Sequence, residues 1–234
     1  MVCMMSEAAA KELKSKISDT NTKVVCGMDG LIECATYDKA DTVLNSVVGM
    51  VGLQPTLEAI KAKKTLALAN KETLVAGGHL VTNLAKENGV QILPVDSEHS
   101  AIFQSMQGMP NKKAIKKIIL TASGGPFFGK TLDELENVTA KDALKHPNWD
   151  MGAKITIDSA TMMNKGLEFI EAKWLFDMPN EDIEIVVHRE SVVHSAIVYQ
   201  DNSMIAQLGV PDMRIPIPVS YTHLRAHETV LDIV

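Results

Sequence analysis

Cysteine and aromatic residues are scarce in this sequence, and long hydrophobic runs are missing from it. The three cysteines, Cys3, Cys26 and Cys34, are an odd number and include no Cys-x-x-Cys pair. This usage fits a reducing compartment and excludes a zinc site built on paired cysteines. Aromatic residues make up 4% of the chain, which argues against a surface that stacks nucleic-acid bases. No apolar run is long enough to span a bilayer, and the first residues lack the pattern of a secretory signal.

The charge balance narrows the classes of partner. The chain has 23 lysine and arginine residues against 29 aspartate and glutamate residues, so its net charge is -6. This balance argues against nucleic acid or an acidic membrane as the main partner. Hydrophobic residues make up 46% of the 234 residues, enough for an ordinary globular core. The length allows one large domain or two small ones.

Short apolar strands alternate with helical segments through residues 22–95. Such alternation predicts parallel βαβ units, and therefore a partial Rossmann-like sheet in an α/β domain. Ligands of these sheets bind beyond the carboxyl ends of the strands, where Gly49, Asn70–Glu72 and Asp96 fall. Gly49-x-x-Gly52 is only part of a dinucleotide-binding fingerprint, and a plain turn explains it better.

The second half of the chain shows a different pattern. A strand is expected at 114–120, and three more at 183–190, 195–199 and 203–208. The turn at 201–203 predicts a hairpin between the last two strands. We therefore expect an α+β domain with a mostly antiparallel sheet, whose edge hairpin could pair with a second copy of the chain.

Asp96 and Glu98 follow a predicted buried strand at 90–95. If the backbone stays extended, side chains two positions apart point to the same side of the strand, so the two carboxylates lie close together. Their repulsion is relieved when one is protonated or when a hard cation such as magnesium or manganese lies between them. The alternative is a solvated Asp-x-Glu at the end of a strand, which is common.

The segment Asp158–Phe176 is predicted to form one helix capped by Asp158 or Ser159. Its expected core stripe is Met163, Leu167, Ile170 and Trp174. Asn164, Lys165 and Glu168 share a neighbouring face, and Gly166 suggests close approach of another group. This face has two interpretations. In the first it is solvated and carries a Lys–Glu pair. In the second, Glu168 completes the ion site while Ser159, Asn164 and Lys165 bind an anion.

Two further segments have the composition of binding loops. Thr121–Pro126 places small residues and glycines after a strand, where backbone N–H groups can converge on an anion, although a plain turn is an equal alternative. His146–Gly152 gathers an imidazole, a carboxamide and an indole within four residues. Such loops often bind ligands, but a lone histidine is more often structural.

Many of these segments together resemble the 1-deoxy-D-xylulose 5-phosphate reductoisomerase family over roughly residues 20–217. The matching segments occur in the family's order, which makes the resemblance specific. They are Gly52–Thr56, Leu68–Val75, Pro94–Ser100, Thr121–Phe127, His146–Trp149, Met151–Thr161, Met163–Glu168 and His188–Ser195.

The resemblance implies an NADPH-dependent enzyme that requires a divalent metal, Mg²⁺ or Mn²⁺ with Co²⁺ also possible. In that family the phosphosugar 1-deoxy-D-xylulose 5-phosphate rearranges and is reduced to 2-C-methyl-D-erythritol 4-phosphate, a step of non-mevalonate isoprenoid biosynthesis. The resemblance also implies a homodimer in the bacterial cytoplasm, with no nucleic-acid or membrane partner.

The resemblance also assigns roles to residues, by position. The metal would be held by Asp96, Glu98 and Glu168. The catalytic residues would be Lys71, Glu98, His146 and Glu168. Substrate contacts would come from Lys71, Ser97, Glu98, Ser123, His146, Ser159, Asn164, Lys165 and Glu168. The nicotinamide side would be lined by Asn70, Glu72 and Gly152, and Trp149 would lie on a mobile flap.

The chain departs from the family at both ends. We find no counterpart of the family's glycine-rich cofactor loop or of its helical carboxyl-terminal domain, and the match stops near Ile217. The expected organisation is a partial NADPH-binding domain at 1–94, a metal- and substrate-binding catalytic domain at 95–218, and a non-family tail at 219–234.

Two other functions stay open at this point. One is a catalytically silent module that binds metal and phosphosugar, which the missing glycine loop favours. The other is a different NAD(P)-dependent dehydrogenase, which the three acidic residues disfavour because simple hydride transfer needs no such ion site.

Overall fold

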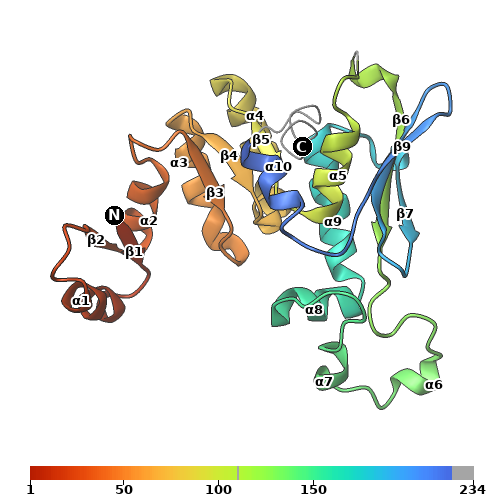
Figure 1. Cartoon of the computed structure of the whole chain (residues 1–234), viewed down its shortest axis with the longest axis horizontal. Helices are drawn as coiled ribbons and strands as arrows, with labels where there is room; N and C mark the ends of the chain where they lie inside the picture. Colours follow the sequence, from red (N-terminus) through yellow and green to blue (C-terminus); the bar gives the residue numbers. More distant parts are fainter. Residues whose placement is uncertain (110, 223–234) are drawn as a thin grey trace, which may run out of the picture. The chain divides into compact units, whose positions relative to one another are not determined.

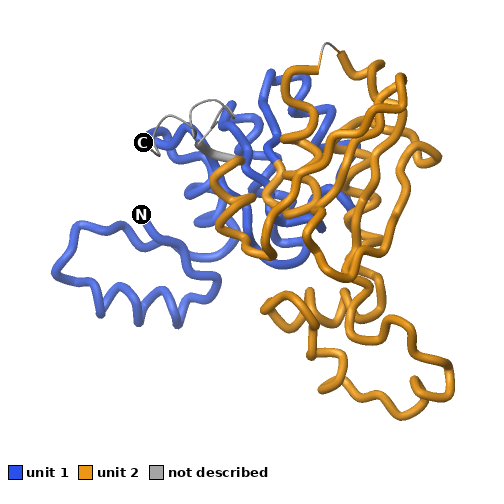
Figure 2. The backbone as a smooth tube through the Cα atoms, turned by 45° about the vertical axis from the view of Figure 1, so that its right-hand side comes forward, with its two compact units in different colours: residues 1–93 blue, residues 94–234 orange. Residues whose placement is uncertain are grey.

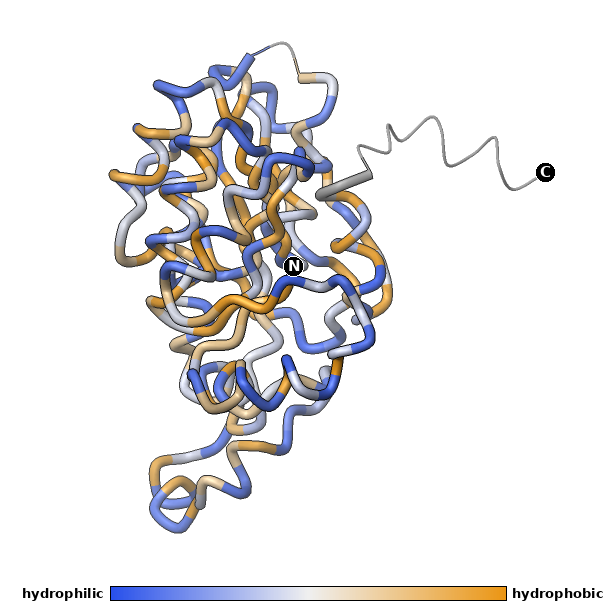
Figure 3. The backbone as a smooth tube through the Cα atoms, turned by 90° about the vertical axis from the view of Figure 1, so that its left-hand side faces the viewer, coloured by the Kyte–Doolittle hydropathy of each residue, from blue (hydrophilic) through white to orange (hydrophobic). Residues whose placement is uncertain are grey.

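The computed structural model describes residues 1–109 and 111–222, and the chain divides into two compact units at 1–93 and 94–234 (Figure 2). The tail expected at 219–234 lies outside the described residues from position 223 onward. Among the described helices, none combines the length and the hydrophobicity needed to cross a bilayer. Hydrophobic and hydrophilic stretches are interspersed along the described backbone (Figure 3).

The first unit is an α/β unit with parallel strand pairing (Figure 1). Its elements are β1 (Val2–Met4), α1 (Glu7–Lys16), β2 (Val24–Cys26), α2 (Gly27–Ala35), β3 (Thr42–Asn45), a 3-10 turn at Gly49–Gly52, α3 (Leu53–Lys61), β4 (Thr65–Leu68), α4 (Lys71–Asn88) and β5 (Ile92–Pro94). Strands β1 and β2 pair in parallel, and a second sheet has the order β3-β4-β5 with β3 and β4 parallel. The predicted Rossmann-like pattern is confirmed.

The second unit is built on a four-stranded sheet. Its elements are α5 (Ser97–Ser105), a 3-10 turn at Lys112–Ala114, β6 (Ile115–Ala122), α6 (Leu132–Leu135), α7 (Ala140–Ala143), α8 (Ala153–Ala160), α9 (Met163–Phe176), a 3-10 turn at Asn180–Asp182, β7 (Ile183–Val187), β8 (Val193–Tyr199), β9 (Met204–Leu208) and α10 (Pro216–Thr222). The strand order is β7-β6-β8-β9. Only β6 and β7 pair in parallel, so the prediction of a mostly antiparallel sheet is confirmed.

Helices α5 and α9 pack against one face of this sheet and form the core of the second unit (Figure 1). Ile102 of α5 and Phe176 of α9 belong to one buried cluster with side chains of the strands, among them Leu120 and Ile197. Burial of these side chains is the main stabilising force for the unit. The two helices are thereby fixed side by side, which positions the polar residues they carry.

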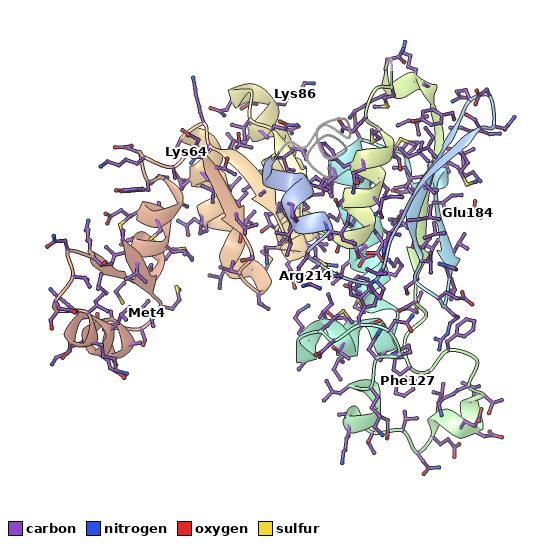
Figure 4. The ribbon with its side chains drawn as sticks, in the orientation of Figure 1. Met4, Lys64, Lys86, Phe127, Glu184 and Arg214 are labelled. Atoms are coloured by element: carbon purple, nitrogen blue, oxygen red, sulfur yellow. The ribbon has the colours of Figure 1, made fainter. Side chains whose placement is uncertain are left out.

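Strand β9 forms one edge of the sheet and exposes apolar side chains. Met204 and Leu208 are 58% and 61% exposed. At the other edge, Glu184 of β7 pairs with Lys117 at 2.8 Å and is labelled in Figure 4. Apolar side chains are exposed on β7 as well, where Ile185, Val186 and Val187 are 41%, 39% and 39% exposed.

The helix predicted over Asp158–Phe176 is in fact two helices, α8 and α9. Met162 adopts a left-handed conformation with φ of 61°, and this breaks the helix between them. The expected stripe is also wrong in part, because Met163 and Ile170 are 55% and 37% exposed. The expected close approach at Gly166 is wrong too, since a Cβ there would meet nothing within 4 Å.

Candidate active site

Three carboxylates converge in the second unit. Asp96, Glu98 and Glu168 each present an oxygen, and these oxygens all lie within 4.8 Å of one another. Two come from the start of α5 and one from the middle of α9, 70 residues later in the sequence than Glu98. Such a set of oxygen donors is the kind that a hard divalent cation prefers.

The start of α5 brings Asp96 and Glu98 together by a different route from the one expected. The backbone does not stay extended: Asp96 is the N-cap of α5, and Glu98 lies in its first turn. The Asp96 carboxylate accepts hydrogen bonds from the backbone N–H groups of Glu98 and His99, at 3.1 and 3.4 Å. An N-cap aspartate satisfies N–H groups that the helix leaves without partners, which fixes the carboxylate beside Glu98.

Lys165 lies among these carboxylates and compensates their charge. Its ammonium is 3.2 Å from a Glu98 oxygen and also pairs with Glu168. Burial, followed by the Glu168 charge, raises the pKa of Glu98 to about 7. Burial alone would lower the pKa of Lys165, but the Glu168 and Glu98 carboxylates raise it above its ordinary value. Lys165 and Glu168 are 5% and 1% exposed, so their polar face of α9 is buried and not solvated.

His99 connects the two helices that carry the carboxylates. Its ring is fully buried, with Nδ1 3.0 Å from the Asp96 carboxylate and Nε2 2.9 Å from the backbone carbonyl of Glu168. Burial opposes its charge, but the Glu171 and Asp96 carboxylates raise the pKa of His99 to about 9. Both ring nitrogens can therefore donate, as an imidazolium does. Sequence analysis gave His99 no role, because a histidine three residues after an aspartate carries no signal of its own.

The opposite end of the site contains a serine–histidine pair. His146 Nδ1 accepts from the backbone N–H groups of Asn148 and Trp149, at 3.2 and 2.9 Å. The proton of the neutral ring is therefore on Nε2, which donates to Ser123 Oγ at 2.9 Å. Burial, with a contribution from Arg189, lowers the pKa of His146 and favours this neutral form. The serine hydroxyl is then left to donate to another acceptor.

A pocket of about 200 Å³ joins these two ends. Eight residues with predicted substrate or metal roles line it: Ser97, Glu98, Ser123, His146, Ser159, Asn164, Lys165 and Glu168. Trp149 lines it as well. Because α9 begins at Met163, Asn164 and Lys165 lie in its first turn, whereas Ser159 belongs to the last turn of α8. The pocket thus combines an acidic end with an end rich in hydrogen-bond donors.

Some predicted site residues do not line this pocket. Asp96 of the carboxylate cluster is not among the lining residues, and neither is Gly152, which lies just before α8 in the second unit. Asn70, Lys71 and Glu72 belong to the first unit, at the start of α4. Asn70 caps α4 and donates to the carbonyls of Val47 and Gly49, at 2.6 and 3.0 Å. These contacts give Asn70 a structural task, and the cofactor roles of the group stay predictions.

Three residues that line the pocket were not anticipated. Ser191, His194 and Met213 come from the segments before, within and after the β8–β9 hairpin. The His194 ring packs edge-on against Trp149, with ring centroids 6.0 Å apart. Ser191 and His194 belong to the segment His188–Ser195 that resembles the family, but their place at the pocket comes from the fold.

Comparison with known proteins places these features in one family. The family model described as 1-deoxy-D-xylulose 5-phosphate reductoisomerase matches residues 1–78, and the model of its C-terminal domain matches residues 92–176. A relative of that name from Agathobacter rectalis is 63% identical over 216 residues, covering 92% of this chain and 57% of the relative. One from Halalkalibacterium halodurans is 59% identical over 231 residues, covering 97% of this chain and 60% of the relative. The chain therefore spans somewhat more than half the length of these relatives.

Solved structures agree with the sequence comparisons. A crystal structure of DOX-P reductoisomerase in complex with NADPH, fosmidomycin and magnesium superposes with a TM-score of 0.90 at 46% identity. The superposition covers 95% of this chain and 57% of that protein. The Zymomonas mobilis enzyme in complex with NADPH gives a TM-score of 0.85 at 45% identity, over 93% of this chain and 56% of that one. Sequence, fold and the two matching family models thus agree that the chain belongs to the 1-deoxy-D-xylulose 5-phosphate reductoisomerase family.

Proposed function

We propose that this chain carries the metal and substrate centre of an NADPH-dependent reductoisomerase that converts 1-deoxy-D-xylulose 5-phosphate into 2-C-methyl-D-erythritol 4-phosphate. The observation that supports this most strongly is the convergence of Asp96, Glu98 and Glu168, the last two of which line a pocket. The same pocket offers hydroxyl donors suited to a phosphate, among them the Ser123 hydroxyl that His146 leaves available to donate. A solved relative that binds NADPH, fosmidomycin and magnesium supports the same assignment.

The donor set fits a divalent cation. Burial, followed by the charge of the neighbouring Glu168, destabilises the charged form of Glu98 and raises its pKa to about 7. Mg²⁺ or Mn²⁺, or Co²⁺ in their place, would relieve that repulsion when held by Asp96, Glu98 and Glu168. A bound ion of this kind polarises a substrate carbonyl and stabilises the negative charge that develops on its oxygen.

The residues of the chain itself bind and orient the substrate. Ser123, Ser159 and Asn164 supply hydrogen-bond donors for the phosphate, with His146 keeping the Ser123 hydroxyl free to donate. Lys165 pairs with Glu98 and also lines the pocket, so its charge can serve the carboxylates or the phosphate. Ser97 lies beside Glu98 and donates to its carboxylate at 2.5 Å, at the end where the carbon skeleton reacts.

The remaining roles follow from the family. Lys71 is proposed as a catalytic and substrate-binding residue, and Asn70, Glu72 and Gly152 as the residues that line the nicotinamide side. NADPH supplies the hydride when it is bound. We assign residues 1–94 to the cofactor and residues 95–218 to catalysis. A homodimer that pairs through the apolar β9 edge fits the 61% exposure of Leu208, and the bacterial relatives suggest the bacterial cytoplasm.

NADPH consumption by the purified chain tests this function. With 1-deoxy-D-xylulose 5-phosphate and Mn²⁺, we expect oxidation of NADPH that is slow, because this chain alone is expected to be poorly active, and that stops when either is left out. Glu168→Gln should abolish it, whereas Glu184→Gln, which removes an exposed carboxylate on β7, should leave it unchanged. Equal turnover by Glu168→Gln contradicts the assignment.

Calorimetric titrations with the phosphosugar and with NADPH, done separately, distinguish the enzyme from the alternative of a catalytically silent binding module. That alternative requires the phosphosugar to bind in the presence of Mn²⁺ while NADPH does not bind. Tight binding of NADPH by the chain contradicts the silent module, and its absence contradicts the enzyme.

A further inference from the structure

The loop that follows β6 has a conformation that favours glycine at two successive positions. Gly124 and Gly125 have φ values of 80° and 68°. A Cβ on Gly125 would lie 2.5 Å from the Ser159 backbone oxygen, and one on Gly124 would lie 2.9 Å from the Phe128 ring. Such a turn holds its backbone groups in fixed directions.

Arg189, which follows β7, holds this loop from outside the pocket. Its guanidinium donates to the backbone carbonyls of Ser123 and Gly125, at 3.1 and 2.7 Å. It also lies over the Phe128 ring, 5.0 Å from the centroid. Arg189 lines a neighbouring cavity and not the candidate pocket, whereas Ser123 and Gly124 line the pocket itself.

The direction of one peptide unit follows from these contacts. The C=O of Ser123 points to Arg189, and the peptide bond to Gly124 is trans. In a trans peptide the N–H points opposite to the C=O, so the N–H of Gly124 points away from Arg189. Gly124 is buried, and its N–H has no acceptor within the part of the chain that the structure describes. A buried N–H without a partner at a pocket wall is a donor available to a bound anion.

Arg189 is also connected to the histidine of the same pocket. The Asn148 side chain donates to the backbone carbonyl of Arg189 and, at 3.1 Å, to Ser191 Oγ. The backbone N–H of Asn148 donates to His146, which in turn donates to Ser123. Hydrogen bonds therefore form a closed ring through Arg189, Ser123, His146 and Asn148, and the ring joins three separate loops.

We propose that Arg189 is a positioning residue for the phosphate end of the pocket: it orients the Ser123–Gly124 peptide so that the N–H of Gly124 faces the anion, and it anchors the His146 loop against it. Its charge acts on the anion through the loop without contacting the ligand. This inference rests on the proposed function, because it assumes that the pocket binds a phosphate.

Inorganic phosphate is the probe for the test, with binding measured by ³¹P NMR titration of the full chain and Mn²⁺ binding measured in parallel. Arg189→Met should weaken phosphate binding about tenfold or more and leave Mn²⁺ affinity within about twofold. Arg189→Lys should have a phosphate affinity between those of Arg189→Met and the unaltered chain. Lys130→Met is the matched control, because it removes an exposed positive charge beside the same neighbouring cavity and should leave phosphate binding unchanged.

A second readout separates positioning from a general structural defect. Because the Arg189 guanidinium helps to lower the pKa of His146, that pKa should rise in Arg189→Met, as measured by NMR titration of the imidazole. Equal phosphate affinity in Arg189→Met and the unaltered chain overturns this inference alone. No phosphate binding by the unaltered chain overturns both this inference and the phosphate end of the proposed function.

Discussion

The ammonium of Lys165 lies 3.2 Å from the Glu98 carboxylate, inside a cluster where the charges of three acids meet. Lys165 and the His99 imidazolium face four carboxylates, those of Asp96, Glu98, Glu168 and Glu171, and burial together with the Glu168 charge raises the pKa of Glu98. The site can therefore accept a further positive charge. The account of function depends on this imbalance.

Removing the lysine should destabilise the chain in the absence of metal. In Lys165→Met the carboxylates of Glu98 and Glu168 lose their buried partner, and loss of one member of a buried ion pair costs about 3–5 kcal/mol. Urea denaturation should show this loss, and saturating Mn²⁺ should restore much of it. Lys154→Met, which breaks an exposed pair with Asp158, should change stability by less than about 1 kcal/mol. Equal stability of the two variants would contradict the prediction.

Replacing His99 should weaken the affinity for the metal, although His99 is not proposed as a metal ligand. In His99→Gln the side chain cannot donate to both the Asp96 carboxylate and the Glu168 carbonyl with the same geometry. Groups that orient metal ligands typically change metal affinity by about 10–100-fold when replaced. We expect Mn²⁺ binding to weaken by about that factor, measured by calorimetry, while phosphate binding changes little. A variant with unaltered Mn²⁺ affinity would show that His99 only fills space.

Gly125 should tolerate no side chain. In Gly125→Ala the new Cβ meets the Ser159 backbone oxygen at 2.5 Å, and backbone cannot move aside cheaply. The matched control is Gly129→Ala, where φ is also positive, at 80°, but a Cβ meets nothing within 4 Å. The control should lose about 1 kcal/mol from strain alone, and Gly125→Ala should lose more. Thermal denaturation of both variants measures the difference, and equal losses would refute the close contact.

Lowering the pH should reduce the free energy of unfolding, in part through His194. Burial lowers the pKa of His194, although the backbone carbonyl of Val210 opposes this. As the pH falls below about 6.5, the unfolded chain takes up a proton that the folded chain does not, so this contribution to stability is lost. His194→Gln should therefore show a smaller drop in the free energy of unfolding between about pH 7.5 and 5.5 than the unaltered chain. An unchanged drop would mean that His194 titrates alike in both states.

Sequence reasoning could predict the fold class because alternating strands and helices carry a period that survives in the structure. It could also select Asp96 and Glu98, since acids beyond a buried strand occupy a known ligand position. The family resemblance added Glu168. The break at Met162 could not be predicted, because a left-handed methionine has no sequence signature.

The burial of the polar face of α9 could not be predicted from the sequence either. Lys165 and Glu168 form the same i, i+3 pattern whether their face is solvated or buried. Only packing against α5 decides between the two, and that packing puts His99 against the Glu168 backbone. Arg189 and His194 were missed for the same reason, since they reach the site from the strands of the sheet.

Titration of the chain with Mn²⁺, followed by electron paramagnetic resonance, tests the central claim most directly. The three converging carboxylates predict one Mn²⁺ site per chain, lost or weakened more than about tenfold in Glu168→Gln and intact in Glu184→Gln. Binding of Mn²⁺ by Glu168→Gln with the affinity of the unaltered chain would contradict the claim that Asp96, Glu98 and Glu168 form one metal centre.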